Sequence, residues 1–187
     1  MNKFTKGNEL YLAREKKIEI LKTIMCFGLS LALFIIGYIT TKTKGNLLTV
    51  VAVLGCLPAS KCAVSMIMHL KIKDCSEQLK EQLLLHTGNL NGYFNLYFTS
   101  YNINYPTSHL VITSNSILAY SESNKIIPNE FENHIQNLLK KDGISDISVK
   151  LFTDFPKYLL RLDELNNGTI NLKENSKVKN LLFSTSL

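Results

Sequence analysis

The 187-residue sequence lacks the short motifs that mark most catalytic sites. It contains no G-x-S-x-G nucleophile elbow and no glycine-rich phosphate loop placed after a strand. Its histidines are scattered without the spacing of metal ligands, at His69, His86, His109 and His134. We therefore expect no catalytic residue, no metal site and no cofactor, and a binding role rather than an enzyme.

Cysteine is also scarce, and its positions exclude a disulfide framework. Cys26, Cys56 and Cys62 fall inside apolar stretches, Cys75 lies outside them, and no C-x-x-C pair occurs. Exported small domains use closely spaced cysteines in even numbers as cross-links. The pattern here agrees with a cytoplasmic setting for the part of the chain that is not apolar.

Charge is missing from two long stretches. Residues 23–41 carry no charged side chain, and at about 1.5 Å per residue a helix of that length covers the ~30 Å hydrocarbon core of a bilayer. Residues 46–70 are apolar apart from Lys61, and we expect a bend or interruption near Pro58. The sequence therefore predicts a two-helix transmembrane hairpin over residues 23–70.

Small residues on the second span predict how this hairpin packs. They recur every three or four positions at Ala52, Gly55, Ala59 and Ala63, a spacing that allows close helix approach in lipid. We take Gly55, Pro58, Ala59 and Lys61 as candidate contacts within the membrane or with a partner. For Lys61 two interpretations stay open. Its amine lies at the interface, by snorkelling or because Pro58 ends the buried segment early, or it has a functional role in an ion or substrate path or in pairing with an acidic partner helix.

The positive charge is concentrated beside the spans. Residues 1–71 hold ten Lys and Arg against three Glu, whereas residues 72–187 hold eleven against twelve Asp and Glu. This asymmetry predicts a two-pass protein of the bacterial plasma membrane with both termini cytoplasmic, and it argues against nucleic acid as a partner. Cleavage of a signal peptide is disfavoured, because the first apolar run is too long and no A-x-A-like site follows it.

The segments outside the hairpin divide into two parts. Residues 1–22 predict a cytoplasmic N-terminal segment, either a helical extension of the first span or an amphipathic helix on lipid. Residues 71–187 predict a small cytoplasmic α/β (α+β) domain, with elements in the order helix, three strands, helix, strand, helix. These elements are expected at residues 74–88, 92–101, 109–113, 117–121, 128–143, 146–152 and 153–168. Residues 169–187 leave a short strand at 169–173 and a short helix at 177–183 open.

The element order is similar to the core of the restriction-endonuclease-like superfamily, some of whose nuclease-related domains are attached to membrane spans. That resemblance implies a divalent metal held by an acidic residue and a (D/E)-x-K pattern on adjacent strands. The sequence departs from the pattern, since Glu122 precedes Lys125 by one residue too many and Asp146 precedes Lys150 by two too many.

A second resemblance covers nearly the whole chain. The stretches NLLTVVAVLGCLPASKCAV, YFTSY and SHLVITSNSILAYSE resemble a group of small two-span membrane proteins of low-GC Gram-positive bacteria. This resemblance implies an architecture and a setting without a mechanism.

Three hypotheses follow for function. The first is a membrane-anchored cytoplasmic binding or regulatory module without catalysis, whose partners are the lipid bilayer and either another protein or copies of itself. The second is a membrane-tethered nuclease-like enzyme with a degenerate site. The third is an accessory subunit of a membrane complex or transporter, with Lys61 at a contact.

Overall fold

The computed structural model describes residues 6–8, 10–43, 45–100, 103–167 and 174–187, in two compact units. One unit is Leu12–Ile72, and the other joins Lys73–Leu187 to the residues that precede Leu12. The division differs from the predicted separate segment 1–22, because Lys6 and Gly7 bind the soluble unit while residues from Leu12 onward belong to the hairpin.

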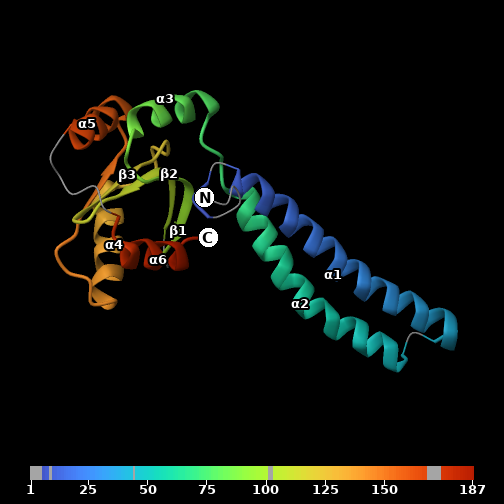
Figure 1. Ribbon diagram of the computed structural model, residues 1–187. Coiled ribbons are helices and arrows are strands. Elements are labelled where there is room, and N and C mark those ends of the chain that lie inside the picture. The colour runs from blue at the N-terminus through green and yellow to red at the C-terminus, as the bar shows by residue number, and fades with distance from the viewer. Residues whose placement is uncertain (1–5, 9, 44, 101–102, 168–173) are drawn as a thin grey trace. The chain divides into compact units, whose positions relative to one another are not determined.

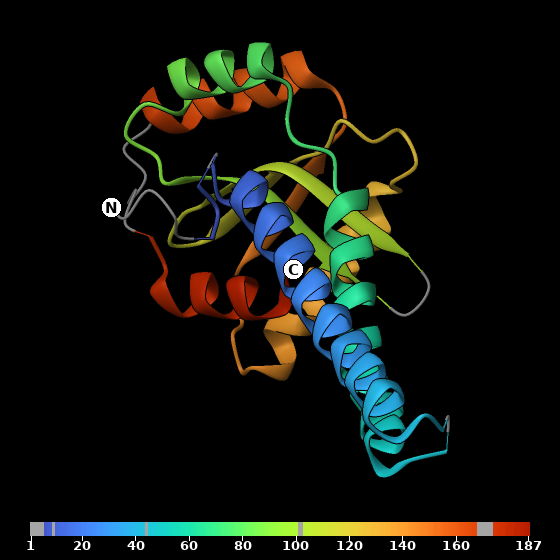
Figure 2. The same ribbon diagram turned by 90° about the vertical axis from the view of Figure 1, so that its right-hand side faces the viewer.

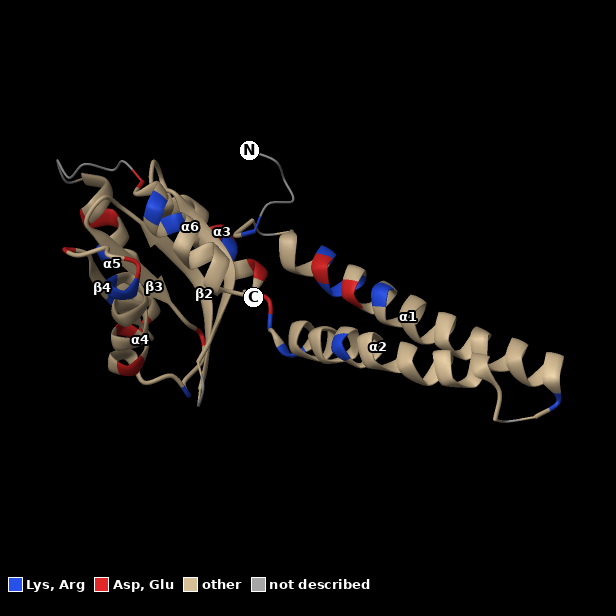
Figure 3. Ribbon diagram, turned by 90° about the horizontal axis from the view of Figure 1, so that it is seen from below, with Lys and Arg blue, Asp and Glu red and all other residues tan. Residues whose placement is uncertain are grey.

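The hairpin unit consists of α1 (Tyr11–Thr41) and α2 (Leu47–Lys71) (Figure 1). Asn46 caps α2, because its side-chain oxygen accepts a hydrogen bond from the Thr49 N–H at 2.8 Å. Both helices are long and apolar enough to cross a membrane, and only 17% and 11% of the residues in their most apolar windows are buried. Lys, Arg, Asp and Glu are concentrated away from the turn (Figure 3).

The expected interruption at Pro58 is wrong. Helix α2 runs unbroken from Leu47 to Lys71 with Pro58 inside it. A proline removes one helical hydrogen bond, but membrane helices tolerate this loss where neighbouring groups satisfy the freed carbonyl. Pro58 therefore leaves the second helix at its full predicted length.

The soluble unit confirms the predicted element order and the α+β class. Its elements are α3 (Glu77–Thr87), β1 (Gly92–Thr99), β2 (Asn104–Ile112), β3 (Ser116–Tyr120), α4 (Pro128–Lys141), β4 (Ser148–Phe152), α5 (Phe155–Asn167) and α6 (Ser176–Thr185). Strand β2 begins five residues earlier than predicted, because Asn104 and Tyr105 continue the ladder opposite Thr99 and Phe98. Helix α6 confirms the possible C-terminal helix, and the possible strand at 169–173 lies outside the described residues.

The four strands form one mixed sheet in the order β1-β2-β3-β4. Strands β1, β2 and β3 pair antiparallel, and β4 returns through α4 to pair parallel with β3. Helices α3 and α5 cover one face of the sheet, while α4 and α6 cover the other (Figure 2). The sheet is therefore buried on both faces, between one core that includes Leu83 and Leu162 and another that includes Phe131 and Leu182.

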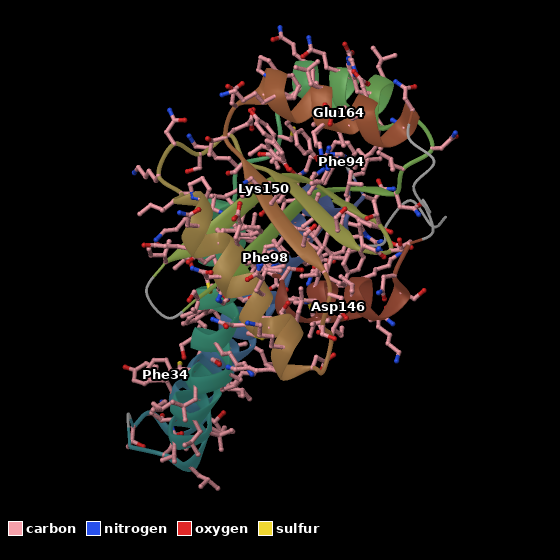
Figure 4. The ribbon with its side chains drawn as sticks, turned by 90° about the vertical axis from the view of Figure 1, so that its left-hand side faces the viewer. Phe34, Phe94, Phe98, Asp146, Lys150 and Glu164 are labelled. Atoms are coloured by element: carbon pink, nitrogen blue, oxygen red, sulfur yellow. The ribbon has the colours of Figure 1, made fainter. Side chains whose placement is uncertain are left out.

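Strand β1 changes face in its middle. Phe94 packs in the core under α3 and α5, whereas Leu96 and Phe98 pack in the core under α4 and α6 (Figure 4). Strict alternation would place these three side chains on one face. Asn95 breaks the alternation with a left-handed φ of +55°, a conformation that asparagine tolerates better than most residues.

Both ends of the described chain cover the free edge of β1. The Phe94 N–H donates to the Gly7 carbonyl oxygen at 2.8 Å, and the Leu187 N–H donates to the Tyr97 carbonyl oxygen at 2.8 Å. The Lys6 amine donates to the Phe183 carbonyl oxygen at the end of α6 at 2.7 Å. Unpaired edge strands template aggregation, so the two chain ends protect this one.

Candidate functional site

The candidate membrane residues divide into two pairs. Ala59 is fully buried between α1 and α2, and a Cβ added to Gly55 would lie 2.7 Å from the Ser30 hydroxyl oxygen. Pro58 and Lys61 are exposed on the surface of α2. Gly55 and Ala59 therefore form the helix contact, whereas Pro58 and Lys61 face away from it.

Lys61 is available for an external contact. Among the described residues no Asp or Glu forms an ion pair with its amine. An ammonium on an apolar helix reaches either the lipid headgroups or an acidic group of another chain. Both interpretations made from the sequence stay open for this residue.

Asn95 ties β1 to the segment that precedes α3. Its side-chain oxygen accepts from the Cys75 N–H at 2.9 Å, and its side-chain amide donates to the Asp74 carboxylate at 3.2 Å. Burial, together with the nearby Glu122 carboxylate, raises the pKa of the Cys75 thiol to about 12. Cys75 is therefore a protonated packing residue and no nucleophile.

The carboxylates of the nuclease-like pattern do not assemble. Glu122 and Asp154 each follow the carboxyl end of one of two parallel strands, β3 and β4, so they lie at the same end of the sheet. Asp146 precedes β4 and lies at the opposite end. Asp154 pairs with Lys157 at 3.2 Å, and no group of three metal-ligating side chains occurs in the described part of the chain.

The most deeply buried histidine is structural. His109 is fully buried, and its Nδ1 lies 2.7 Å from the Tyr158 hydroxyl oxygen, which is also fully buried. Burial lowers the pKa of His109 to about 3 and raises the pKa of Tyr158, so both side chains are neutral at physiological pH. The pair joins β2 to α5 across the core.

The other histidines do not gather with His109 or with one another. His86 on α3 contacts the Asp163 carboxylate of α5 at 2.8 Å, and the His134 ring packs on the ring of Tyr105. Burial lowers the pKa of His134. His86 and His134 therefore lie in separate environments on different elements.

Two open hollows flank the loop between α4 and β4, and we call the area they form the loop surface. The first, of about 530 Å³, is lined by Gln136, Leu139, Lys140, Ile144, Ser145, Asp146, Ile147 and Ser148. The second, of about 460 Å³, is lined by Asp142, Ile144, Lys177, Asn180, Leu181 and Ser184. Ile144 belongs to both hollows, so they meet at this side chain.

The loop surface combines apolar and charged side chains. Its apolar lining includes Leu139, Ile144, Ile147 and Leu181, and charges of both signs line it at Lys140, Asp142, Asp146 and Lys177. The loop is conformationally specified, because Gly143 and Asp146 both have positive φ, at +70° and +68°. Apolar side chains bordered by charges of both signs are common at protein–protein contacts.

Sequence reasoning missed the loop surface. The helix predicted over residues 128–143 ends at Gly143, and the sequence predicts no role for the loop that follows. Its one signal is the apolar pair Ile144 and Ile147 within a turn, where polar residues are more usual. The loop surface also includes residues of α6, which lie more than thirty residues further along the chain and are brought there by tertiary packing.

Comparison of the chain with models of known protein families, with curated proteins and with solved structures finds no match.

Proposed function

We propose that the protein is a membrane-anchored binding module of the bacterial plasma membrane. In this proposal α1 and α2 span the bilayer with both termini in the cytoplasm, and the α+β unit binds a segment of a partner protein at the loop surface. The single observation that carries the binding role is the pair of hollows that meet at Ile144.

The distribution of side chains on the hairpin supports the membrane anchor. Its buried positions include Thr23, Ser30, Gly37, Ala52 and Ala59, which are small. Its exposed positions include large apolar side chains such as Ile24, Leu29, Ile39, Leu54 and Leu57. A helix pair in lipid packs small residues between its helices and exposes large apolar residues to the lipid. A helix pair in water shows the reverse arrangement.

The charge of the soluble unit supports a protein partner. Residues 72–187 are close to neutral, whereas a nucleic-acid face needs clustered basic residues. Each hollow of the loop surface is lined by one lysine and one aspartate, so a partner segment with both charges and an apolar anchor fits best.

Reporter fusions test the anchor and its orientation. A reporter that is active only in the cytoplasm is fused after Leu187, and a second fusion is placed in the turn at Gly45. We expect activity from the C-terminal fusion and none from the turn fusion. No activity from the C-terminal fusion, with activity from the turn fusion, would contradict the orientation.

Site-specific photocrosslinking in intact cells tests the binding role. A photoreactive residue replaces Ser145 on the loop surface, and a matched control replaces Glu164 on the exposed face of α5. We expect a discrete adduct from position 145 and none from position 164. Lys140→Glu with Lys177→Glu should reduce that adduct at least fivefold, whereas Lys125→Glu, at an exposed position away from the hollows, should leave it unchanged.

The mass of the adduct identifies the molecule that binds the loop surface. An adduct with a different protein supports the proposal, and a covalent dimer of this chain assigns the loop surface to self-association instead. Equal labelling from positions 145 and 164 would contradict a specific site.

A second candidate, an accessory subunit of a membrane complex, is favoured by the exposed Lys61. An acidic partner helix in lipid would satisfy its amine. Lys61→Ala is then expected to disrupt co-purification of the complex, whereas Lys61→Arg preserves it. Unchanged assembly in both variants would remove this candidate.

A nuclease-like activity is favoured by the mixed sheet with β4 parallel to β3, and opposed by the separation of Asp146 from Glu122 and Asp154. Incubation of the purified protein with linear DNA and Mg²⁺ or Mn²⁺ tests it. Cleavage that is lost in Glu122→Ala would establish the activity against our leading proposal.

A further inference from the structure

Two cysteines face each other across the hairpin. The Sγ atoms of Cys26 on α1 and Cys62 on α2 lie 3.8 Å apart, and both side chains are half-buried. A disulfide bond needs an S–S distance of about 2.05 Å, so joining them requires the sulfur atoms to approach by about 1.8 Å. Close helix contact at Ala59, one turn before Cys62, places the two backbones near enough for that adjustment.

The pair lies at the charged end of the hairpin. Lys22 is one turn before Cys26, and its amine pairs with the Glu19 carboxylate of the same helix at 2.8 Å. Lys61 is adjacent to Cys62 and is exposed. Because lysine amines on a membrane helix extend to water or headgroups, the two sulfur atoms lie within reach of the hydrated interface.

The other two cysteines have no such arrangement. Cys56 is exposed on α2, and its thiol contacts the Ala52 carbonyl oxygen of its own helix. Cys75 is buried in the soluble unit, and its pKa is raised to about 12. The chain thus contains one facing pair and two separate thiols, which serve as internal controls.

We propose that Cys26 and Cys62 form a reversible redox modification site, in which oxidation by a hydroperoxide cross-links α1 to α2. The Cys62 thiolate attacks one peroxide oxygen, so that the O–O bond breaks and hydroxide leaves and takes up a proton to become water. The resulting sulfenic acid is attacked by the Cys26 sulfur, an S–S bond forms, and a second water leaves. Two thiols lose two electrons and two protons, and hydrogen peroxide becomes two water molecules.

The reverse step needs a thiol reductant. A thiolate attacks one sulfur of the bridge, a mixed disulfide forms, and a second thiol releases it. In a reducing cytoplasm the pair stays reduced as two thiols. Exposure to peroxide links α1 to α2 through a disulfide bond.

Thiol counting on the full chain in lipid nanodiscs tests the proposal. Cys56→Ser with Cys75→Ser keeps the facing pair, and Cys26→Ser with Cys62→Ser is the matched control that keeps the separate thiols. Each variant is treated with hydrogen peroxide, quenched in acid, denatured and labelled with a maleimide polymer that shifts its gel mobility once per free thiol.

We expect the facing-pair variant to lose both labels together, about tenfold faster than the control loses both, because an adjacent thiol resolves the first sulfenic acid without diffusing to it, whereas the control needs two separate oxidations. Dithiothreitol should restore both labels, and the protein should stay monomeric on a non-reducing gel. Equal rates in the two variants, loss that dithiothreitol does not reverse, or disulfide-linked dimers would each overturn the proposal.

Discussion

The hairpin and the soluble unit place the same residue types in opposite environments. In the hairpin the buried positions between Leu12 and Ile72, which lie at the two ends of the unit, are small or polar, such as Ser30 and Ala59, and most large apolar side chains are exposed. In the soluble unit Phe131, Tyr158 and Leu162 are fully buried. Each unit is consistent with one solvent, lipid for the first and water for the second.

The difference shows that an apolar residue has no fixed contribution to stability. In water its burial removes apolar surface from the solvent, which is favourable by about 25 cal/mol per Å². In lipid that driving force between helices is absent, and close packing of small residues such as Gly55 and Ala59 replaces it. The predictions below test this contrast, from the largest expected effect to the smallest.

Truncating one leucine in each unit gives the largest contrast. Leu162→Ala in α5 should lower the free energy of unfolding by about 2–5 kcal/mol, because it leaves a cavity in a packed core. Leu54→Ala in α2, where the side chain is 58% exposed, should change it by less than about 0.5 kcal/mol. Denaturation of the protein in detergent micelles, followed by circular dichroism, measures both. Equal losses in the free energy of unfolding in the two variants would contradict the contrast between the hairpin and the soluble unit.

Acid should destabilise the soluble unit through His109. Its folded pKa of about 3 lies below the unfolded value of 6.5, so the unfolded chain takes up the proton first. The stabilisation is complete above pH 6.5 and is lost as the pH falls toward 3, by about 2 kcal/mol at pH 5.

A pH series of denaturation curves measures this loss. The His109→Gln variant should have a lower free energy of unfolding at pH 7. Between pH 6.5 and 5, however, its free energy of unfolding should fall less steeply with pH than that of the wild type, because the contribution of His109 is gone. An unchanged slope in that variant would assign the acid sensitivity to other groups.

Enlarging a glycine should affect the hairpin only where its two helices touch. Gly55→Leu should destabilise it by about 1–3 kcal/mol, because its added Cβ meets the Ser30 hydroxyl at 2.7 Å. Gly28→Leu should be neutral, since nothing lies within 4 Å of its added Cβ. Thermal melting in nanodiscs compares the two, and a larger loss in Gly28→Leu would contradict the observed packing.

The smallest effect is expected where the N-terminal residues cover the β1 edge. Gly7 has a φ of +85°, and an added Cβ would lie 2.7 Å from a ring carbon of Tyr93. Gly7→Ala should cost about 1 kcal/mol and speed hydrogen exchange of the Phe94 amide, which donates to the Gly7 carbonyl. Gly45→Ala in the turn meets no atom within 4 Å and is the control. Unchanged exchange at Phe94 would argue against the edge contact.

The sequence predicts the element order because the pattern that marks each helix or strand lies within consecutive residues. The uncharged run 23–41 and the periodicity of the segment that forms α4 each arise from consecutive residues and one solvent boundary. The same locality explains the errors. The change of face at Asn95 and the early start of β2 depend on pairing with another segment, which no single stretch encodes.

By itself, then, the sequence determined the two apolar helices, the α+β order and the small contact residues Gly55 and Ala59. The tertiary structure alone decided that Cys26 meets Cys62, that the loop after Gly143 meets α6, and that Lys6 and Gly7 join the soluble unit. The physical reason is distance along the chain. Local periodicity specifies which face of an element is buried, but which distant element covers it depends on the packing of the whole chain.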